Sequence, residues 1–213
     1  MNAKETILSK KEYLKDYIVR FMVEITKMSN NKLNNAEIYT LIYNKEAFVP
    51  TLYQNKDIFE IINLYICFDY IFKNNEKLSV GKIKEINNLI TKNIEYQVIQ
   101  KTGTFFQEKF TTEDQELERI IEEYNSVNGD IYTKLTHLFC QVLLNKLLEK
   151  DTIKTLIMII NSELIVNGLY PVVLDKEEIN TMVGYITTIN KDRIARKIRE
   201  KQEYEQSRCN SFM

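Results

Sequence analysis

Apolar positions recur every three or four residues along most of the chain, which is the spacing that one face of an α-helix requires. With only five glycines and two prolines in 213 residues, few positions favour turns. The pattern therefore predicts an all-α fold. Helices are expected near residues 4–28, 35–45, 57–74, 79–97, 113–125, 130–149, 152–167, 175–188 and 190–206.

Residues that favour helix caps mark several of the expected ends. Asp151 and Ser79 are N-cap candidates, and Gly168 is a C-cap candidate. The stretch KTGTFFQEKFTT, residues 101–112, has β-forming residues around a glycine and predicts a short β-hairpin or flap. After Ile198 the apolar stripe ends, so an exposed, fraying helix is expected there, with a partner-binding tail as the alternative.

The length of the chain suits a single domain, expected over residues 1–190, followed by a C-terminal helix and polar tail over 191–213. The 29 basic and 30 acidic residues give a net charge of -1, which favours neither nucleic acid nor an anionic membrane as a partner. No apolar run reaches the roughly 18 residues of a membrane span, and the first residues do not have a secretory signal pattern. A cytoplasmic protein is expected, with a secreted effector as the alternative.

The side chains that often carry catalysis are sparse. The three cysteines, Cys67, Cys140 and Cys209, are an odd and widely spaced set, which favours a reducing compartment. His137 is the only histidine, so no metal site is expected. It lies in the apolar stretch THLFCQVLL, which predicts a core histidine bonded to a backbone carbonyl, with a catalytic role as the alternative.

Three lysines are spaced by four residues. Lys146, Lys150 and Lys154 would form one positive stripe on an unbroken helix. The structural interpretation is a solvated face. The functional interpretation is a site for phosphate or for an acidic partner.

The stretch NKLLEKDTIKTLIMIINSELIVNGLYP, residues 145–171, resembles the Fic (Fic/Doc, or Fido-fold) family. In that family a His-Pro-Phe-x-Asp/Glu-Gly-Asn-Gly-Arg-Thr-x-Arg loop precedes an apolar helix, an asparagine and a Gly-x-x-Pro turn. Lys154 falls on the first arginine of this pattern, Thr155 on the threonine and Asn161 on the asparagine. The resemblance implies a Fic-like helical domain, whose active members transfer AMP to protein side chains.

The catalytic positions of the pattern are replaced. Lys146 stands at the histidine base, Leu148 at the phenylalanine and Lys150 at the acid that holds the metal. A rival register, with His137 as the base, leaves surplus residues before Asn161 and is not preferred. The further replacements are Leu147 for proline, Asp151, Thr152 and Ile153 for Gly-Asn-Gly, and Ile157 for the second arginine.

A second segment, SNNKLNNAEIYTLIYNK, resembles the family's inhibitory helix of pattern Ser/Thr-x-x-x-Glu-Gly/Asn. Ser29 and Asn34 match, whereas Leu33 replaces the glutamate that pairs with the second arginine in relatives. In this chain Leu33 and Ile157 replace both members of that pair. Replacing both is physically consistent, because one charge left buried without its partner would cost several kcal/mol. Phe106 stands where the family has an arginine before its target-docking flap.

These replacements predict a degenerate active site. A lysine ammonium is a poor general base at neutral pH, and Asp151 adds a Cβ and a negative charge where glycine admits phosphate. The chain is expected to be a bacterial pseudoenzyme that binds a protein, such as an active Fic protein or its target in a toxin–antitoxin or effector system. No cofactor is expected.

Two alternatives stay open. One is a nucleotidyl- or phosphotransferase that uses ATP and magnesium, with a lysine-rich loop and Asp151 or His137 as acid or base. The other is an unrelated all-α interaction domain, which would lack the loop-connected helix pair at 130–167.

Overall fold

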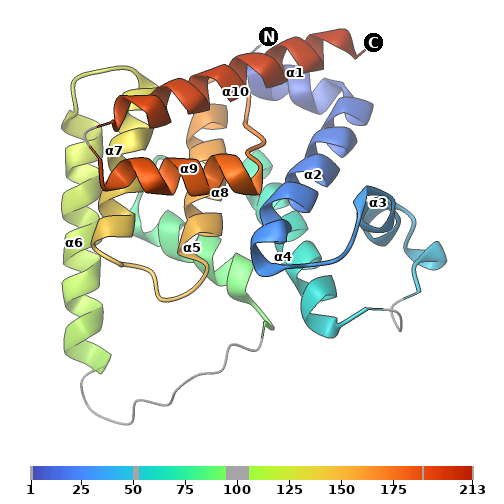
Figure 1. Cartoon of the computed structure of the whole chain (residues 1–213), viewed down its shortest axis with the longest axis horizontal. Helices are drawn as coiled ribbons and strands as arrows, with labels where there is room; N and C mark the ends of the chain where they lie inside the picture. Colours follow the sequence, from blue (N-terminus) through green and yellow to red (C-terminus); the bar gives the residue numbers. More distant parts are fainter. Residues whose placement is uncertain (1, 50–52, 95–105, 189, 213) are drawn as a thin grey trace.

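The computed structural model describes residues 2–49, 53–94, 106–188 and 190–212, and for residues 106–112 it describes the backbone only. These residues form helices and connecting loops, and no strand occurs among them (Figure 1). The helices are α1 (Ala3–Ser9), α2 (Lys11–Thr26), η1 (Lys27–Ser29), α3 (Asn35–Tyr43), η2 (Lys45–Ala47), α4 (Asn55–Lys73), α5 (Val80–Thr91), α6 (Phe106–Ser126), α7 (Ile131–Leu144), α8 (Thr152–Val166), α9 (Lys176–Ile186) and α10 (Asp192–Ser211).

Helix α8 is the central element of the fold. It packs against α1, α4, α5 and α7, and in Figure 1 it lies behind α9 in the middle of the molecule. Every residue from Lys154 to Ile165 is buried. A helix that is apolar on all sides needs neighbours on all sides, which explains why the sequence TLIMIINSELI occupies this place.

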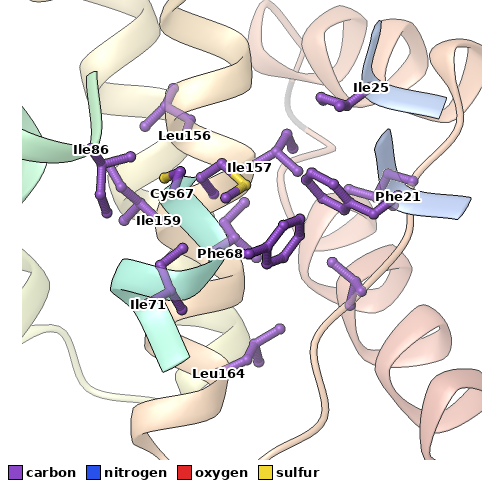
Figure 2. Close-up of a cluster of buried hydrophobic side chains, with 14 of the residues drawn as sticks. Phe21, Ile25, Cys67, Phe68, Ile71, Ile86, Leu156, Ile157, Ile159 and Leu164 are labelled. Atoms are coloured by element: carbon purple, nitrogen blue, oxygen red, sulfur yellow. The ribbon is translucent and has the colours of Figure 1, made fainter. Parts of the chain in front are cut away.

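The core beside α8 is aromatic. Figure 2 shows Phe21 of α2 and Phe68 of α4 converging with Ile157 of α8. The ring centroids of Phe21 and Phe68 are 4.8 Å apart at an interplanar angle of 83°, an edge-to-face arrangement. Phe68 also meets the ring of Tyr17 edge-on at 5.6 Å. This cluster joins α2 and α4 to the central helix.

The sequence located most helices correctly and several of their caps. Ser79 accepts a hydrogen bond from the Lys82 backbone N–H, and Gly168 has a φ of 74° just after α8, where the left-handed region favours glycine. The long helix expected over 4–28 is broken at Lys10. No glycine or proline marks this break, and the Lys10 ammonium donates to the carbonyls of Cys209 and Phe212 at the distant end of α10.

The expected hairpin is not present in the part of 101–112 that the structure describes. Residues 106–112 belong to α6, and residues 101–105 lie outside the described residues. The β-forming residues of this stretch also fit a helix, because propensity in strands depends strongly on context.

The expected fraying after Ile198 is wrong. Helix α10 continues to Ser211 and buries Gln202, Glu205 and Cys209. Polar side chains replace the apolar stripe on its inner face. The carboxylate of Glu205 accepts two hydrogen bonds from Arg20, at 2.8 and 2.9 Å, and one from the Tyr13 hydroxyl at 3.1 Å. The buried face of this helix is therefore polar and ion-paired, which an apolar pattern does not reveal.

We expect Phe68→Ala to lower the free energy of unfolding by about 3–5 kcal/mol, because it leaves a cavity among the packed rings. Urea titration followed by circular dichroism measures the loss. Leu144→Ala, at a side chain that is 51% exposed on α7, should change stability by less than about 0.5 kcal/mol. Equal losses in the two variants would contradict this account of the core.

We expect Asp16 to stabilise the fold at neutral pH and to lose this effect in acid. Burial alone would raise its pKa, but hydrogen bonds from Arg208 and Arg20 outweigh burial and hold the pKa below its usual value. A lowered folded pKa gives stability that is present above the unfolded pKa, about 3.9, and is lost as the pH falls through the folded pKa. The stability difference between wild type and Asp16→Asn should therefore shrink below about pH 4. Urea titrations from neutral to acidic pH test this, and a constant difference would contradict it.

Candidate functional site

The loop between α7 and α8 contains residues 145–151, where the sequence placed its altered motif. Helix α7 ends at Leu144, so the lysines do not share one continuous helix. Lys146 is exposed with a φ of 51°, and Asp151 has a φ of 47°. Left-handed backbone is uncommon at residues with a Cβ, so the loop holds two strained positions.

Lys154 lies in the first turn of α8 and is 5% exposed. Its ammonium forms a close ion pair with Glu60 of α4 and a second pair with Asp151 Oδ1 at 2.9 Å. Glu60 is 1% exposed. The second oxygen of Asp151, Oδ2, is buried and has no hydrogen-bond partner among the described residues. Two carboxylates thus surround one buried ammonium.

The altered inhibitory segment lies against the same cluster. Ser29 Oγ donates a 2.6 Å hydrogen bond to Glu60 Oε1, and Asn31 Nδ2 donates a 2.8 Å bond to Glu60 Oε2. Asn34 caps α3 by accepting from two backbone N–H groups of its first turn. Leu33 is buried in the core. The segment therefore contacts α8 indirectly, through the carboxylate of Glu60.

Thr155, at the threonine of the pattern, and Thr152 both have structural partners. Thr155 is buried, and its hydroxyl accepts a 2.8 Å hydrogen bond from Asn87 Nδ2 of α5. The same amide donates to the Lys150 carbonyl at 2.8 Å. Thr152 Oγ1 donates to the Leu148 carbonyl at 2.7 Å. These bonds fix the loop to α5 on one side and to α8 on the other.

A cleft of about 390 Å³ opens beside the loop, between α5 and α6. Leu117, Leu147 and Leu148 give it apolar walls, and Lys150 lines it with polar residues of α5 and α6. Asn87 also lines this cleft, and its two hydrogen bonds tie the cleft to the start of α8. The cleft combines apolar walls with polar groups, as small-molecule and peptide sites do.

His137 lies away from the loop, on α7. Its Nε2 is 3.0 Å from Glu123 Oε2 of α6, and its side chain is 27% exposed. The expected backbone carbonyl partner is therefore wrong, and the side chain is only partly buried. The residue links α6 and α7, and nothing in its surroundings joins it to the Lys154 cluster.

Within the residues that the structure describes, no three or more histidine, cysteine, aspartate or glutamate side chains gather in a way that suits a metal ion. In the same residues, no helix is both long and apolar enough to span a membrane.

Comparison with known proteins supports the fold. No family model and no curated protein matches the sequence. Among solved structures, the chain is similar to a fragment of Fic-1 from C. elegans, with a TM-score of 0.72 over 99% of this chain and 69% of that chain. Because the two sequences are only 11% identical, the likeness shows the fold alone. The predicted all-α, Fic-like fold is confirmed.

Sequence reasoning missed two residues that organise the site, Glu60 and Asn87. Glu60 is the lone acid in the apolar run FEIINLYICF. An acid in such a run is rarely buried without a partner, so this residue predicts a buried cation from another part of the chain. Asn87 gives no such signal, because an asparagine on an amphipathic helix is unremarkable. Neither residue belongs to the motif segments that the resemblance brought forward.

We expect Lys154→Met to cost about 3–5 kcal/mol of stability, since it leaves the buried carboxylate of Glu60 and the partly buried carboxylate of Asp151 without their cation. The double variant Glu60→Gln/Lys154→Met should recover part of this loss, because it removes one of those charges. Lys146→Met, at an exposed residue of the same loop, should change stability by less than about 0.5 kcal/mol. Urea titrations of wild type, Glu60→Gln, Lys154→Met and the double variant form a double-mutant cycle, with Lys146→Met as the control, and additive losses would contradict the coupling.

Proposed function

We propose that this Fic-like protein acts by binding another protein and does not transfer nucleotides. The observation that carries the proposal is that the charge of Lys154 is already paired, with Glu60 and with Asp151. A phosphate group entering this position would meet two carboxylates before it met an available cation. Their repulsion is strong in a buried site, where the effective dielectric constant is low.

The loop conformation supports the same proposal. Asp151 is left-handed and its side chain lies directly before α8, at the end of a helix where an anion would otherwise be favoured. Its carboxylate already supplies the negative charge. Lys146, at the position that the resemblance gives to the base, is an exposed residue of the loop.

An exposed aromatic surface on α3 and α4 supports protein binding. Tyr39 is 42% exposed, Tyr65 is 36% exposed and Ile66 is 42% exposed. Tyr43 joins them, with its ring centroid 5.2 Å from that of Tyr39 and 6.1 Å from that of Tyr65. Tyrosine is enriched at protein interfaces because it offers large contact area at a low cost in conformational entropy.

The kind of partner follows from the resemblance. A Fic protein that retains its motif, or the target of such a protein, would place this chain in a toxin–antitoxin or effector setting as a regulator. The loop-connected pair α7 and α8, together with the similarity to Fic-1, supports this context over an unrelated all-α domain.

One observation favours the enzymatic alternative. The cleft of about 390 Å³ next to the loop is large enough for a small ligand, and its lining includes Lys150 and Lys84, which pairs with Asp114. In that alternative the protein would be a nucleotidyl- or phosphotransferase using ATP and magnesium, with the cleft rather than Lys154 as its anion site.

We expect the purified protein to transfer no labelled nucleotide to itself or to added proteins in the presence of ATP and magnesium. Calorimetric titration with ATP and magnesium should show no micromolar binding, because the Lys154 ammonium at the start of α8 is already paired. Transfer that disappears in Lys146→Ala would contradict the proposal. Micromolar ATP binding that Lys150→Ala weakens, while Lys146→Ala leaves it unchanged, would favour the cleft-based enzyme instead.

A further inference from the structure

The side chain of Asp151 does not have the role that its position predicts. It is the N-cap residue of α8, yet within the described structure its carboxylate accepts no capping hydrogen bond. The other aspartate N-caps, Asp130 of α7 and Asp175 of α9, both accept one. Asp151 has a left-handed backbone, with a φ of 47°, and one of its carboxyl oxygens contacts Lys154. The contact with Lys154 therefore takes the place of the usual cap.

The two oxygens of the Asp151 carboxylate have unequal surroundings. Oδ1 lies 2.9 Å from Lys154 Nζ. Oδ2 is shut off from solvent and has no hydrogen-bond partner among the described residues. A buried oxygen without a partner costs free energy in the folded protein. An amide keeps only one of the two oxygens of a carboxylate, so converting this group to an amide would remove that cost.

Glu60 lies on the other side of the same ammonium. Its carboxylate forms a close ion pair with Lys154 and accepts hydrogen bonds from Ser29 Oγ at 2.6 Å and Asn31 Nδ2 at 2.8 Å. Lys154 is 5% exposed and Glu60 is 1% exposed. One lysine nitrogen thus contacts two carboxylates in a place with little access to water. Such positioning lowers the barrier to a reaction between these groups, and the exclusion of water prevents the reverse hydrolysis.

We propose that Lys154 and Asp151 join in an intramolecular isopeptide bond, with Glu60 as the proton carrier. Glu60 takes a proton from the ammonium, and the free amine attacks Cγ of Asp151. The bond from Nζ to Cγ forms, and the bond from Cγ to one carboxyl oxygen breaks. Glu60 transfers two protons in turn from the nitrogen to that oxygen, which leaves as water. One ammonium and one carboxylate become one amide and one water, Glu60 ends as a carboxylate again, and no other reactant is needed.

The bond fixes the loop between α7 and α8 to the first turn of α8. It also removes the positive charge of Lys154, so a phosphate group would find no cation there. The inference goes beyond the proposed function and does not depend on it, because either a protein-binding regulator or a transferase can have a cross-linked loop.

Mass spectrometry of the full-length wild-type protein tests the bond. We expect the intact mass, after ageing at physiological temperature, to be lower than the sequence mass by one water. Trypsin does not cut after a lysine whose ammonium has become an amide. The cross-linked protein should therefore give the peptide 151–176, lighter by one water, whereas the protein without the bond is cut after Lys154.

Lys82 of α5 is the matched control. It is 2% exposed, and its Nζ lies 2.9 Å from Glu163 Oε1, the same distance as between Lys154 and Asp151. Its other acceptor is the backbone carbonyl of Glu76, so among the described residues no second carboxylate contacts this lysine to carry protons. Trypsin should therefore still cut after Lys82 in the unfolded protein.

Glu60→Gln keeps the shape of the proton carrier and removes its ability to take up a proton. We expect this variant to have the full mass of its own sequence. If it does not fold, Ser29→Ala/Asn31→Ala gives the second test, because it keeps all the reacting groups and removes donors that orient Glu60. The fraction of that variant that has lost water should be at least about tenfold smaller than in wild type at equal times.

Four results would overturn the proposal. They are a wild-type protein of full mass, a loss of water that leaves Lys154 open to trypsin, an equal loss in folded Glu60→Gln, and an equal cross-link at Lys82. The second result indicates that an aspartate has closed a ring on its own backbone. None of these measurements uses a nucleotide, so nucleotide transfer by the wild-type protein would contradict only the proposed function.

Discussion

A lysine ammonium buried in the first turn of the central helix needs negatively charged partners inside the protein. Lys154 meets this requirement with Glu60 and Asp151, and Glu60 in turn binds the segment that joins α2 to α3. The constraint links three parts of the fold, because a single unpaired charge in this place would cost several kcal/mol. It also determines what the loop can bind, since the cation that would attract an anion already has its partners.

Buried ion pairs recur where distant helices meet. Lys82 pairs with Glu163 between α5 and α8, and Arg20 binds Glu205 through two parallel hydrogen bonds between α2 and α10. Such pairs give geometric specificity, because each charge has few acceptable partners in the interior. Together with the aromatic cluster around Phe68, they explain how a long, polar C-terminal helix belongs to the same core as the apolar α8.

The functional picture follows from what the scaffold keeps and what the loop has changed. The helices have a Fic-like fold, and the hydrogen bonds of Asn87 hold the loop and Thr155 to α5. Asp151 of the loop and Glu60 of α4 pair with the buried ammonium of Lys154, and an exposed lysine stands where the resemblance expects a base. The tyrosines on α3 and α4 form an aromatic surface, and the proposal of a protein partner rests in part on this surface.

Hydrophobic spacing alone determined the all-α class and the approximate helix ranges. The burial of α8 in the structure agrees with its apolar residues on every side. Local capping chemistry likewise predicted Ser79 and Gly168 as helix ends. Only the tertiary structure decided the partners of charged residues. Glu60 and Lys154 are 94 residues apart, and no local pattern records that the two meet. The partners of Lys10, at the break between α1 and α2, are likewise distant, since they are carbonyls at the other end of the chain.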